Sequence, residues 1–445
     1  MSSPTHQGQG WRLKFTAYGL GLIALLALVL PMQARAVPAF ARQTGQNCVA
    51  CHAGGQFPEL TPYGRMFKMT GYTIGQRTVP LSVMGLASSS SIANAPAGTA
   101  KTATPILATA SVFLAGKVTD NIGAFTQITY DNYAVDNGDG SYSGHSNADN
   151  IDIRFANHIA GEQQDWIYGV SLNNNPSLTD PWNTAAAWMQ YVPVPSPSSS
   201  QFIDGTSPYP GFASGGNIAG LNAYLFWNRT VYAELGTYRT ADQALSFMSA
   251  GVDPKTQLSG SNNPYWRLAL SHEWGPHNVM VGTSGMVAHV YDDPTDTSDP
   301  ASVGQFRNTG VDAQYQYILD PHTVTAQLAY MKTEQTYSDA MNAGLPNPGV
   351  SDTNTVKRAK LGYTYQAKYG GSLSFFDLSG SSNNQSDPAT SGTTYEAFFI
   401  PVQNIRIGAQ YTSYSKYLGA GTNYDGAGRN ASDNNSMFLY VWFAY

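Results

Sequence analysis

The sequence predicts an all-β fold: a transmembrane, antiparallel β-barrel of about 16 strands that follows a small N-terminal segment. Three observations predict it. Apolar and polar residues alternate with a period of two from about Gly75 to the end, short and long connections alternate, and the last strand is apolar on one side and ends on an aromatic residue. A soluble β-sandwich would show the same alternation, so the other two observations decide between these folds.

The alternation is clear in residues 151–156, 311–317 and 405–411. In the last of these, Ile405, Ile407 and Tyr411 share one face of a strand, and Arg406 and Gln410 share the other. A membrane barrel with a polar lumen needs strands of this kind, apolar toward lipid and polar toward the interior.

The connections between these segments fall into two classes. Short ones are expected at 119–121, 161–165, 228–229, 275–277, 320–321, 369–371 and 403–404, and long polar ones at 132–149, 176–217, 292–305 and 419–435. Short turns at one end and long loops at the other are typical of outer-membrane barrels, as is the even number of strands. An even number returns the chain to the side where it began, which places the N-terminal segment and Tyr445 in the periplasm.

Aromatic residues support the same fold. Girdles at the two membrane interfaces are expected from Tyr224, Trp227, Tyr238, Trp266, Trp274 and Tyr330. The final strand presents Met437, Leu439, Val441, Phe443 and Tyr445 as an apolar stripe, which looks like the final-strand signal of bacterial outer-membrane barrels.

The N-terminus predicts export. Arg12 and Lys14 precede an apolar run from Leu20 to Leu30, and Ala34-Arg35-Ala36 has the small-x-small pattern of a cleavage site, so residues 1–36 form a signal peptide. A membrane anchor is the alternative, but the run is shorter than the roughly 20 residues of a spanning helix. The chain is acidic, with a formal net charge of −6, which argues against nucleic acid as a partner.

Residues 37–76 contain a motif with a known chemistry. Cys48-Val49-Ala50-Cys51-His52 has the C-x-x-C-H spacing that attaches c-type haem, with two thioether bonds from the cysteines and His52 against the iron. A zinc site would need a second pair of ligands, and a thioredoxin-like pair would need a βαβ setting; the chain has only 2 cysteines and no such pattern. We therefore expect one covalent haem c, and no disulfide.

A short helix is expected soon after the motif. Thr61 and Pro62 suit its N-cap and first turn, and Gly71 suits its C-terminal stop. Met69 and Met66 lie three residues apart on this helix, so that either thioether could be the second axial ligand of the iron. The alternatives are that both pack against the haem edge and that Met84 or a histidine is the ligand.

The haem segment resembles a known family in its motifs. Ala39–Gly45, Cys48–His52, Pro58–Lys68 and Gly71–Thr73 are similar to the outer-membrane monohaem cytochrome c–porin fusion family, whose best-known members are bacterial Fe(II) oxidases. The resemblance covers the barrel, residues 77–445, only in architecture. It implies roles for Cys48, Cys51 and His52 and for no barrel residue.

The resemblance implies an electron conduit. Electrons would pass from an extracellular donor, with Fe(II) favoured, through the haem to a periplasmic cytochrome c or copper protein, in a barrel surrounded by outer-membrane lipid. Family members need not all oxidise iron. The rival functions are a diffusion porin whose haem segment is structural or gating, and a conduit that reduces an external acceptor.

The haem segment has about the right bulk to plug the lumen of such a barrel. Polar residues expected on the lumen wall could seat it, or could line an open pore: Asp152, Arg154, Glu234, Arg267, Asp312 and Arg406. Aspartates of the long loops could bind cations, but solvation is the favoured role of Asp131, Asp136, Asp139, Asp292, Asp293, Asp296 and Asp299. His272 and His277 flank a turn and are expected to be turn residues rather than a chelate.

Overall fold

The computed structural model describes residues 38–55, 59–95, 105–136, 142–161, 164–184, 218–249 and 257–445. The expected signal peptide lies outside these residues. Pro38–Tyr445 forms one compact unit. No helix in the described part of the chain is long and apolar enough to cross a bilayer.

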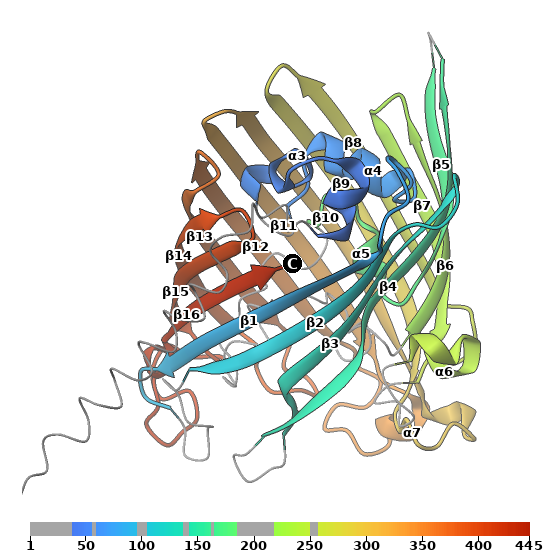
Figure 1. Ribbon diagram of the computed structural model, residues 1–445. Helices are drawn as coiled ribbons and strands as arrows, with labels where there is room; N and C mark the ends of the chain where they lie inside the picture. Colours follow the sequence, from blue (N-terminus) through green and yellow to red (C-terminus); the bar gives the residue numbers. More distant parts are fainter. Residues whose placement is uncertain are drawn as a thin grey trace, which may run out of the picture. The chain divides into compact units, whose positions relative to one another are not determined.

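Sixteen strands form a single closed sheet in which β1 pairs with both β2 and β16 (Figure 1). Every neighbouring pair is antiparallel. The predicted fold class and strand number are confirmed. The strands are β1 (Leu81–Ile92), β2 (Ile106–Lys117), β3 (Ile122–Asp136), β4 (Tyr142–Ala160), β5 (Asp165–Asn173), β6 (Ile218–Trp227), β7 (Val231–Thr240), β8 (Pro264–Trp274), β9 (His277–Tyr291), β10 (Val303–Leu319), β11 (His322–Thr336), β12 (Asp352–Tyr365), β13 (Tyr369–Gly380), β14 (Thr390–Val402), β15 (Ile405–Lys416) and β16 (Ser436–Ala444).

The alternation places apolar side chains outside and polar ones inside. On β8, Leu268 and Leu270 are exposed, whereas Arg267, the residue before Leu268, is only 1% exposed. The apolar stripe of β16 also faces outward, as predicted. A closed sheet leaves no backbone hydrogen-bonding group unpaired at an edge, which is the condition for crossing lipid.

Two aromatic residues face the other way from the prediction. Trp227, Trp266, Trp274 and Tyr330 are exposed on the outer face, as expected, but Tyr224 and Tyr238 are buried. The reason is register: Tyr224 lies three residues before Trp227 on β6, so the two side chains point to opposite faces of the sheet.

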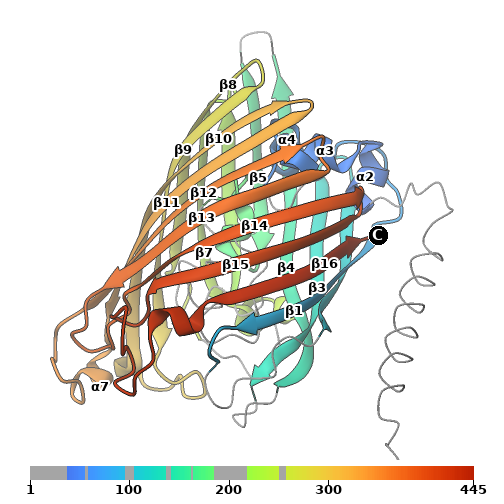
Figure 2. The same cartoon turned by 90° about the vertical axis from the view of Figure 1, so that its left-hand side faces the viewer.

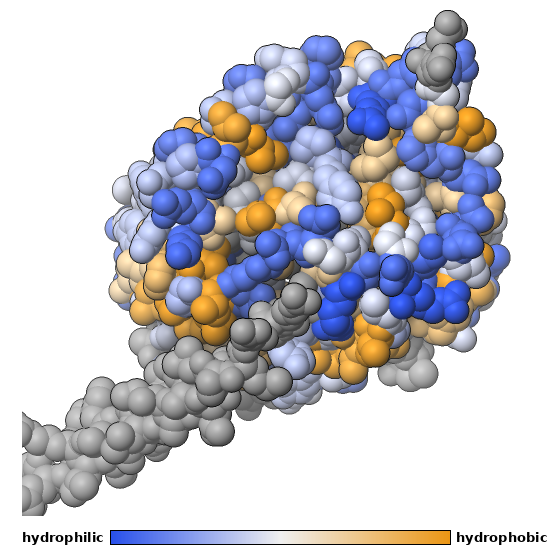
Figure 3. Space-filling model, turned by 45° about the horizontal axis from the view of Figure 1, so that its top comes forward, coloured by the Kyte–Doolittle hydropathy of each residue, from blue (hydrophilic) through white to orange (hydrophobic). Residues whose placement is uncertain are grey.

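The connections form two classes at opposite ends of the barrel (Figure 2). The predicted short turns are present, except that the β12–β13 turn is 366–368 rather than 369–371. Gln366 and Ala367 adopt positive φ there, and Gly370 pairs within β13. The predicted loop 132–149 is largely strand, because β3 and β4 extend as a hairpin whose backbone pairing needs no apolar face. Figure 3, tilted so that the end with the short turns comes forward, shows mostly hydrophilic residues there and apolar residues on the flanks.

The N-terminal residues 38–55 and 59–76, here called the plug, lie inside the barrel near its short-turn end (Figure 1). The helices of the plug are α2 (Ala39–Thr44), α3 (Cys48–Cys51), η1 (Ala53–Gly55) and α4 (Pro62–Met69), and those of the long connections are α5 (Pro176–Thr179), α6 (Ala241–Ala244), η2 (Ser246–Met248), η3 (Pro300–Ser302), α7 (Asp339–Asn342) and η4 (Ala431–Asn434).

The predicted boundaries of α4 are confirmed. The Thr61 hydroxyl accepts a hydrogen bond from the Gly64 N–H at 3.1 Å, and Pro62 occupies the first turn. At the other end, the Gly71 N–H donates to the Lys68 carbonyl and the Tyr72 N–H to the Phe67 carbonyl, which is the Schellman pattern with Gly71 at positive φ.

Candidate functional site

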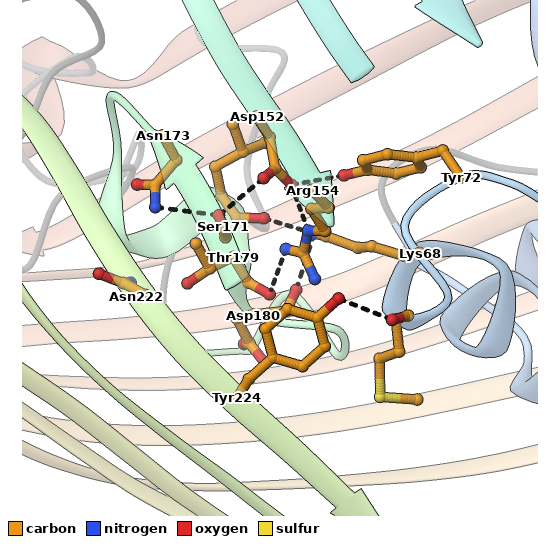
Figure 4. A network of polar contacts seen from close by, with 12 residues as sticks. Lys68, Tyr72, Asp152, Arg154, Ser171, Asn173, Thr179, Asp180, Asn222 and Tyr224 are labelled. Atoms are coloured by element: carbon orange, nitrogen blue, oxygen red, sulfur yellow. Dashed lines mark hydrogen bonds and ion pairs between the residues drawn. The ribbon is translucent and has the colours of Figure 1, made fainter. Parts of the chain in front are cut away.

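Buried charged residues hold the plug against strands β4 to β6 (Figure 4). The Tyr72 hydroxyl donates to Asp152 at 2.6 Å, and Asp152 forms an ion pair with Arg154 at 2.7 Å. The Tyr224 hydroxyl donates to the Met69 carbonyl at 2.7 Å, which satisfies a carbonyl at the end of α4. Asp152 and Arg154 therefore lie on the lumen wall and seat the plug, as predicted.

Residues 176–184 fold back into the lumen and contact the plug. Lys68 donates hydrogen bonds to the carbonyls of Leu178 and Asp180, the second at 3.0 Å. The carboxylate of Asp180 pairs with Arg267 at 3.0 Å, and Arg267 also pairs with Asp312 at 2.8 Å. Arg267 and Asp312 thus support the plug indirectly, through this segment. The segment belongs to the predicted long loop 176–217, whose remainder lies outside the described residues.

A second group of contacts holds the other side of α4. Arg65 donates to Asn278 at 2.9 Å and to Gln316 at 3.0 Å, on β9 and β10. Glu59, at the start of the segment that leads into α4, forms an ion pair with Lys360 of β12 at 2.6 Å. Glu59, Arg65 and Lys68 were not among the predicted site residues, although two cations on one short helix were a usable signal.

Two of the predicted lumen residues are inside but do not contact the plug through the bonds described. Glu234 accepts hydrogen bonds from Asn222 at 2.7 Å and Tyr232 at 2.9 Å. Arg406 pairs with Glu396 at 2.6 Å, and its guanidinium lies 4.0 Å from the centre of the Phe398 ring.

The C-x-x-C-H motif forms α3 and the residue that follows it. Cys48 and Cys51 are free thiols at the two ends of this single turn, where residues three apart share a face. The Thr61 N–H donates to the Cys51 carbonyl at 2.9 Å, so the start of α4 is fastened to the end of α3. Gly64 is required at this crossing, because a Cβ there would overlap the Cys51 carbonyl.

Burial shifts the pKa values of the motif's side chains. Burial raises the pKa of Cys51 to about 11, so its thiol is protonated near neutral pH, unlike that of a redox-active pair. Burial lowers the pKa of His52 to about 4, while the Glu59 carbonyl raises it. His52 is therefore a neutral imidazole at pH 7, the form that binds metals.

Met66 and Met69 do not face the motif. Gly64 is the residue of α4 that packs on Cys51, and the helical period places Met66 and Met69 on the other side. Met69 is 2% exposed and packs with Trp182, Tyr224 and other wall residues, and Met66 packs on the same cluster. Both thioethers therefore pack toward the barrel wall, and the assignment of the second axial ligand stays a prediction.

The loop aspartates behave as loop residues. Asp293 accepts bonds from the Thr295 N–H and hydroxyl, and Asp296 does the same with Ser298. These bonds lower the pKa of both carboxyls. Among the described residues there is no group of three or more metal-ligating side chains, and Asp139 lies outside them. His272 and His277 stack on Trp274 instead of converging on a chelate.

Solved structures that resemble this chain include outer-membrane channels and porins. No family model matches the chain, and neither does any curated protein. The outer membrane channel DcaP of Acinetobacter baumannii is 12% identical over 82% of this chain and 96% of its own, with a TM-score of 0.45. OmpF of Salmonella typhi, solved with daunomycin, is 12% identical over 82% of this chain and 97% of its own, with a TM-score of 0.44. An anion-selective porin from Comamonas acidovorans is 10% identical over 82% of this chain and 99% of its own, with a TM-score of 0.44.

At these identities and TM-scores, the likeness carries no functional argument. The structure itself indicates the class of membrane protein. An even number of antiparallel strands closed on themselves, apolar outside and polar within, with short turns at one end and long loops at the other, is the architecture of bacterial outer-membrane barrels. The chain is a porin-like barrel of the outer membrane.

Proposed function

We propose that the chain is an outer-membrane c-type cytochrome that conducts electrons across the membrane, with extracellular Fe(II) as the donor and a periplasmic cytochrome c or copper protein as the acceptor. One observation carries the proposal: the C-x-x-C-H motif lies on a plug that is held inside the lumen of a closed barrel.

The residues of the motif fit one haem c. Cys48 and Cys51 would form the thioether bonds, and His52 would be the proximal ligand. The Glu59 carbonyl next to the His52 ring suits the second-shell role of orienting a metal-bound imidazole. When bound, the haem supplies one-electron redox chemistry, and the protein supplies its place in the membrane.

The position of the plug supports the assignment of the two sides. The plug and Tyr445 share the short-turn end, which is the periplasmic end in barrels of this class. A periplasmic acceptor would therefore meet the motif, where Val49 is exposed. Beyond the plug, polar residues such as Thr394, Thr412 and Ser436 line the lumen wall. A hydrated Fe(II) ion would be compatible with such a polar lining.

The proposal has two direct tests. Oxidised protein in detergent is mixed anaerobically with Fe(II), and the haem bands are followed by stopped flow; rapid reduction supports iron oxidation. If Fe(II) does not reduce the haem but another donor reduces it promptly, the chain would still be an electron conduit, and its donor would not be iron. Cys48→Ala with Cys51→Ala should abolish haem staining on a denaturing gel, and surviving stain would refute covalent attachment at this motif.

A diffusion porin with a structural or gating plug is the second candidate. The polar lumen wall, with Arg358, Lys360 and Arg406 facing inward, favours it. Ion current in planar bilayers separates the two, because a sealed conduit passes little current. A conduit that reduces an external acceptor would differ in its reduction potential, which would lie below that of an iron oxidase.

A further inference from the structure

Part of the connection between β7 and β8 lies on the outer face of the barrel. Residues 241–249, here called the cover, contain α6 and η2, and Figure 1 shows α6 beside β6, toward the end with the long loops. Ile151 of β4 and Ala219 of β6 point outward, because exposed residues follow each of them at even intervals along the strand. Both are nevertheless only 3% and 4% exposed, since they pack with Ala241 and Met248 of the cover.

A groove lies between the cover and the outer face of β3 and β4. This groove, here called the outer groove, has a volume of about 370 Å³. Its apolar lining includes Ile128, Ile151, Ile153 and Phe247, and its polar lining includes Ser146 and Asn147. Ile128 of β3 and Phe247 of the cover are 46% and 60% exposed. The outer groove is therefore continuous with the apolar surface that the barrel presents to lipid.

The outer groove lies at the outer border of the apolar band of the barrel. Ile151 is nine residues from Ala160, which is the end of β4 on the short-turn side. At about 3.3 Å per residue and a tilt of about 40°, these residues rise about 23 Å along the membrane normal. The apolar band of such barrels is about 25 Å tall, and their long loops lie outside the cell. The groove therefore meets the outer leaflet, close to its headgroups.

An arginine lies on the same outer face. Arg239 of β7 pairs in register with Ala219, and both point to the lipid side. Leu235, four residues earlier on the same face of β7, is 65% exposed. The Nε atom of Arg239 is buried and donates to no group in the described part of the chain. An outward guanidinium with an unused donor, close to the headgroups, is complementary to a phosphate.

We propose that the outer groove binds an acyl chain of lipid A, the phosphorylated glycolipid that anchors lipopolysaccharide in the outer leaflet, and that Arg239 binds one of its phosphates. Strands β4 and β7 are three strand spacings apart, about 14 Å in all. Lipid A has several chains on a disaccharide with a phosphate on each sugar, so one molecule reaches both features. The inference is independent of the haem motif.

A second copy of the chain is a poorer occupant of the groove. A stable interface between two proteins buries about 800 Å² on each partner, and a groove of this volume supplies only a small part of that area. A single acyl chain needs no more than a narrow apolar groove.

The test measures lipid binding to the full chain in detergent by native mass spectrometry. The probes are lipid A, dephosphorylated lipid A and phosphatidylethanolamine. Ile128→Trp fills the groove from the barrel side and should lower the affinity for lipid A by about tenfold or more, as for the loss of about two buried CH₂ groups. Leu328→Trp is the matched control, because Leu328 is an exposed, outward-facing leucine of β11, and it should leave the affinity unchanged.

Arg239→Gln tests the phosphate contact. The substitution should lower the affinity for lipid A by about tenfold or more and leave the affinity for dephosphorylated lipid A unchanged. Arg307→Gln is the matched control, because Arg307 is exposed on the outer face of β10 at the same end of the barrel.

A further variant guards against a folding defect. Phe247→Ala opens the groove from the cover and leaves every barrel strand intact, and it should also weaken lipid A binding. Equal binding by wild type and both groove variants, or an equal loss in either control, would overturn the site. Phosphatidylethanolamine that binds as tightly as lipid A would overturn the choice of lipid. A wild-type oligomer that Ile128→Trp dissociates would show that the groove is an interface between copies instead.

Discussion

Lys68 offers the sharpest test of how the plug is held. Its ammonium donates to two main-chain carbonyls of residues 176–184, those of Leu178 and Asp180, and its side chain is buried. Lys68→Met keeps the length and apolar stem of the side chain and removes both hydrogen bonds. The backbone pairing between the barrel strands is unchanged.

The expected cost follows from the chemistry of the two bonds. A hydrogen bond from a charged group contributes about 1.5–3 kcal/mol, so the pair contributes roughly 3–6 kcal/mol. The substitution recovers part of this, because methionine needs no desolvation of an ammonium. A net loss of about 2 kcal/mol corresponds to a roughly 30-fold increase in the population of the displaced plug.

The assay is single-molecule current in planar bilayers. For Lys68→Met we expect the fraction of time in high-conductance states to rise by about 30-fold over wild type. Lys368→Met is the matched control, because Lys368 is an exposed lysine in the β12–β13 turn at the same end of the barrel. Equal open fractions in wild type and Lys68→Met, or an equal rise in the control, would refute the role of this contact.

Three further outcomes are expected. Burial is the main cause that lowers the pKa of Lys68 to about 8 from its usual 10.5, so a released plug binds more protons than a docked plug. The open fraction should therefore fall as pH rises from about 8 toward 10.5, by at most about tenfold per pH unit. Lys68→Met should abolish that slope in the same bilayer recordings. Gly64→Ala should lower haem incorporation strongly, because the added Cβ meets the Cys51 carbonyl. Gly45→Ala should lower it little, because Gly45 has open space around it and the substitution costs only the strain of a positive φ. Equal haem content in the two variants would contradict the close contact between Gly64 and Cys51. Unheated protein should migrate differently from boiled protein on a detergent gel, because a closed sheet resists unfolding; identical mobility, or a helical circular dichroism spectrum, would contradict the barrel.

The sequence by itself determined the barrel. Period-two alternation, the two classes of connection and the stripe ending at Tyr445 are local signals, and each depends only on which face of a strand a side chain takes. The boundaries of α4 were equally local, since Thr61 and Gly71 act within one turn of the helix end. The spacing of Cys48, Cys51 and His52 is also a local signal, because the C-x-x-C-H pattern spans only five consecutive residues.

Only the tertiary structure decided what each inward residue meets. Alternation predicts that Asp152 and Arg406 face the lumen, but closure of the sheet brings Asp152 to the plug and Arg406 to Glu396 and the Phe398 ring. The position of Met69 shows the same limit. Helical spacing put Met66 and Met69 on one face, but only the fold shows that Gly64 packs on α3 and that the two thioethers pack on the cluster around Trp182. Residues distant in sequence, such as Met84 and Ala444, become neighbours only because β1 closes the barrel against β16.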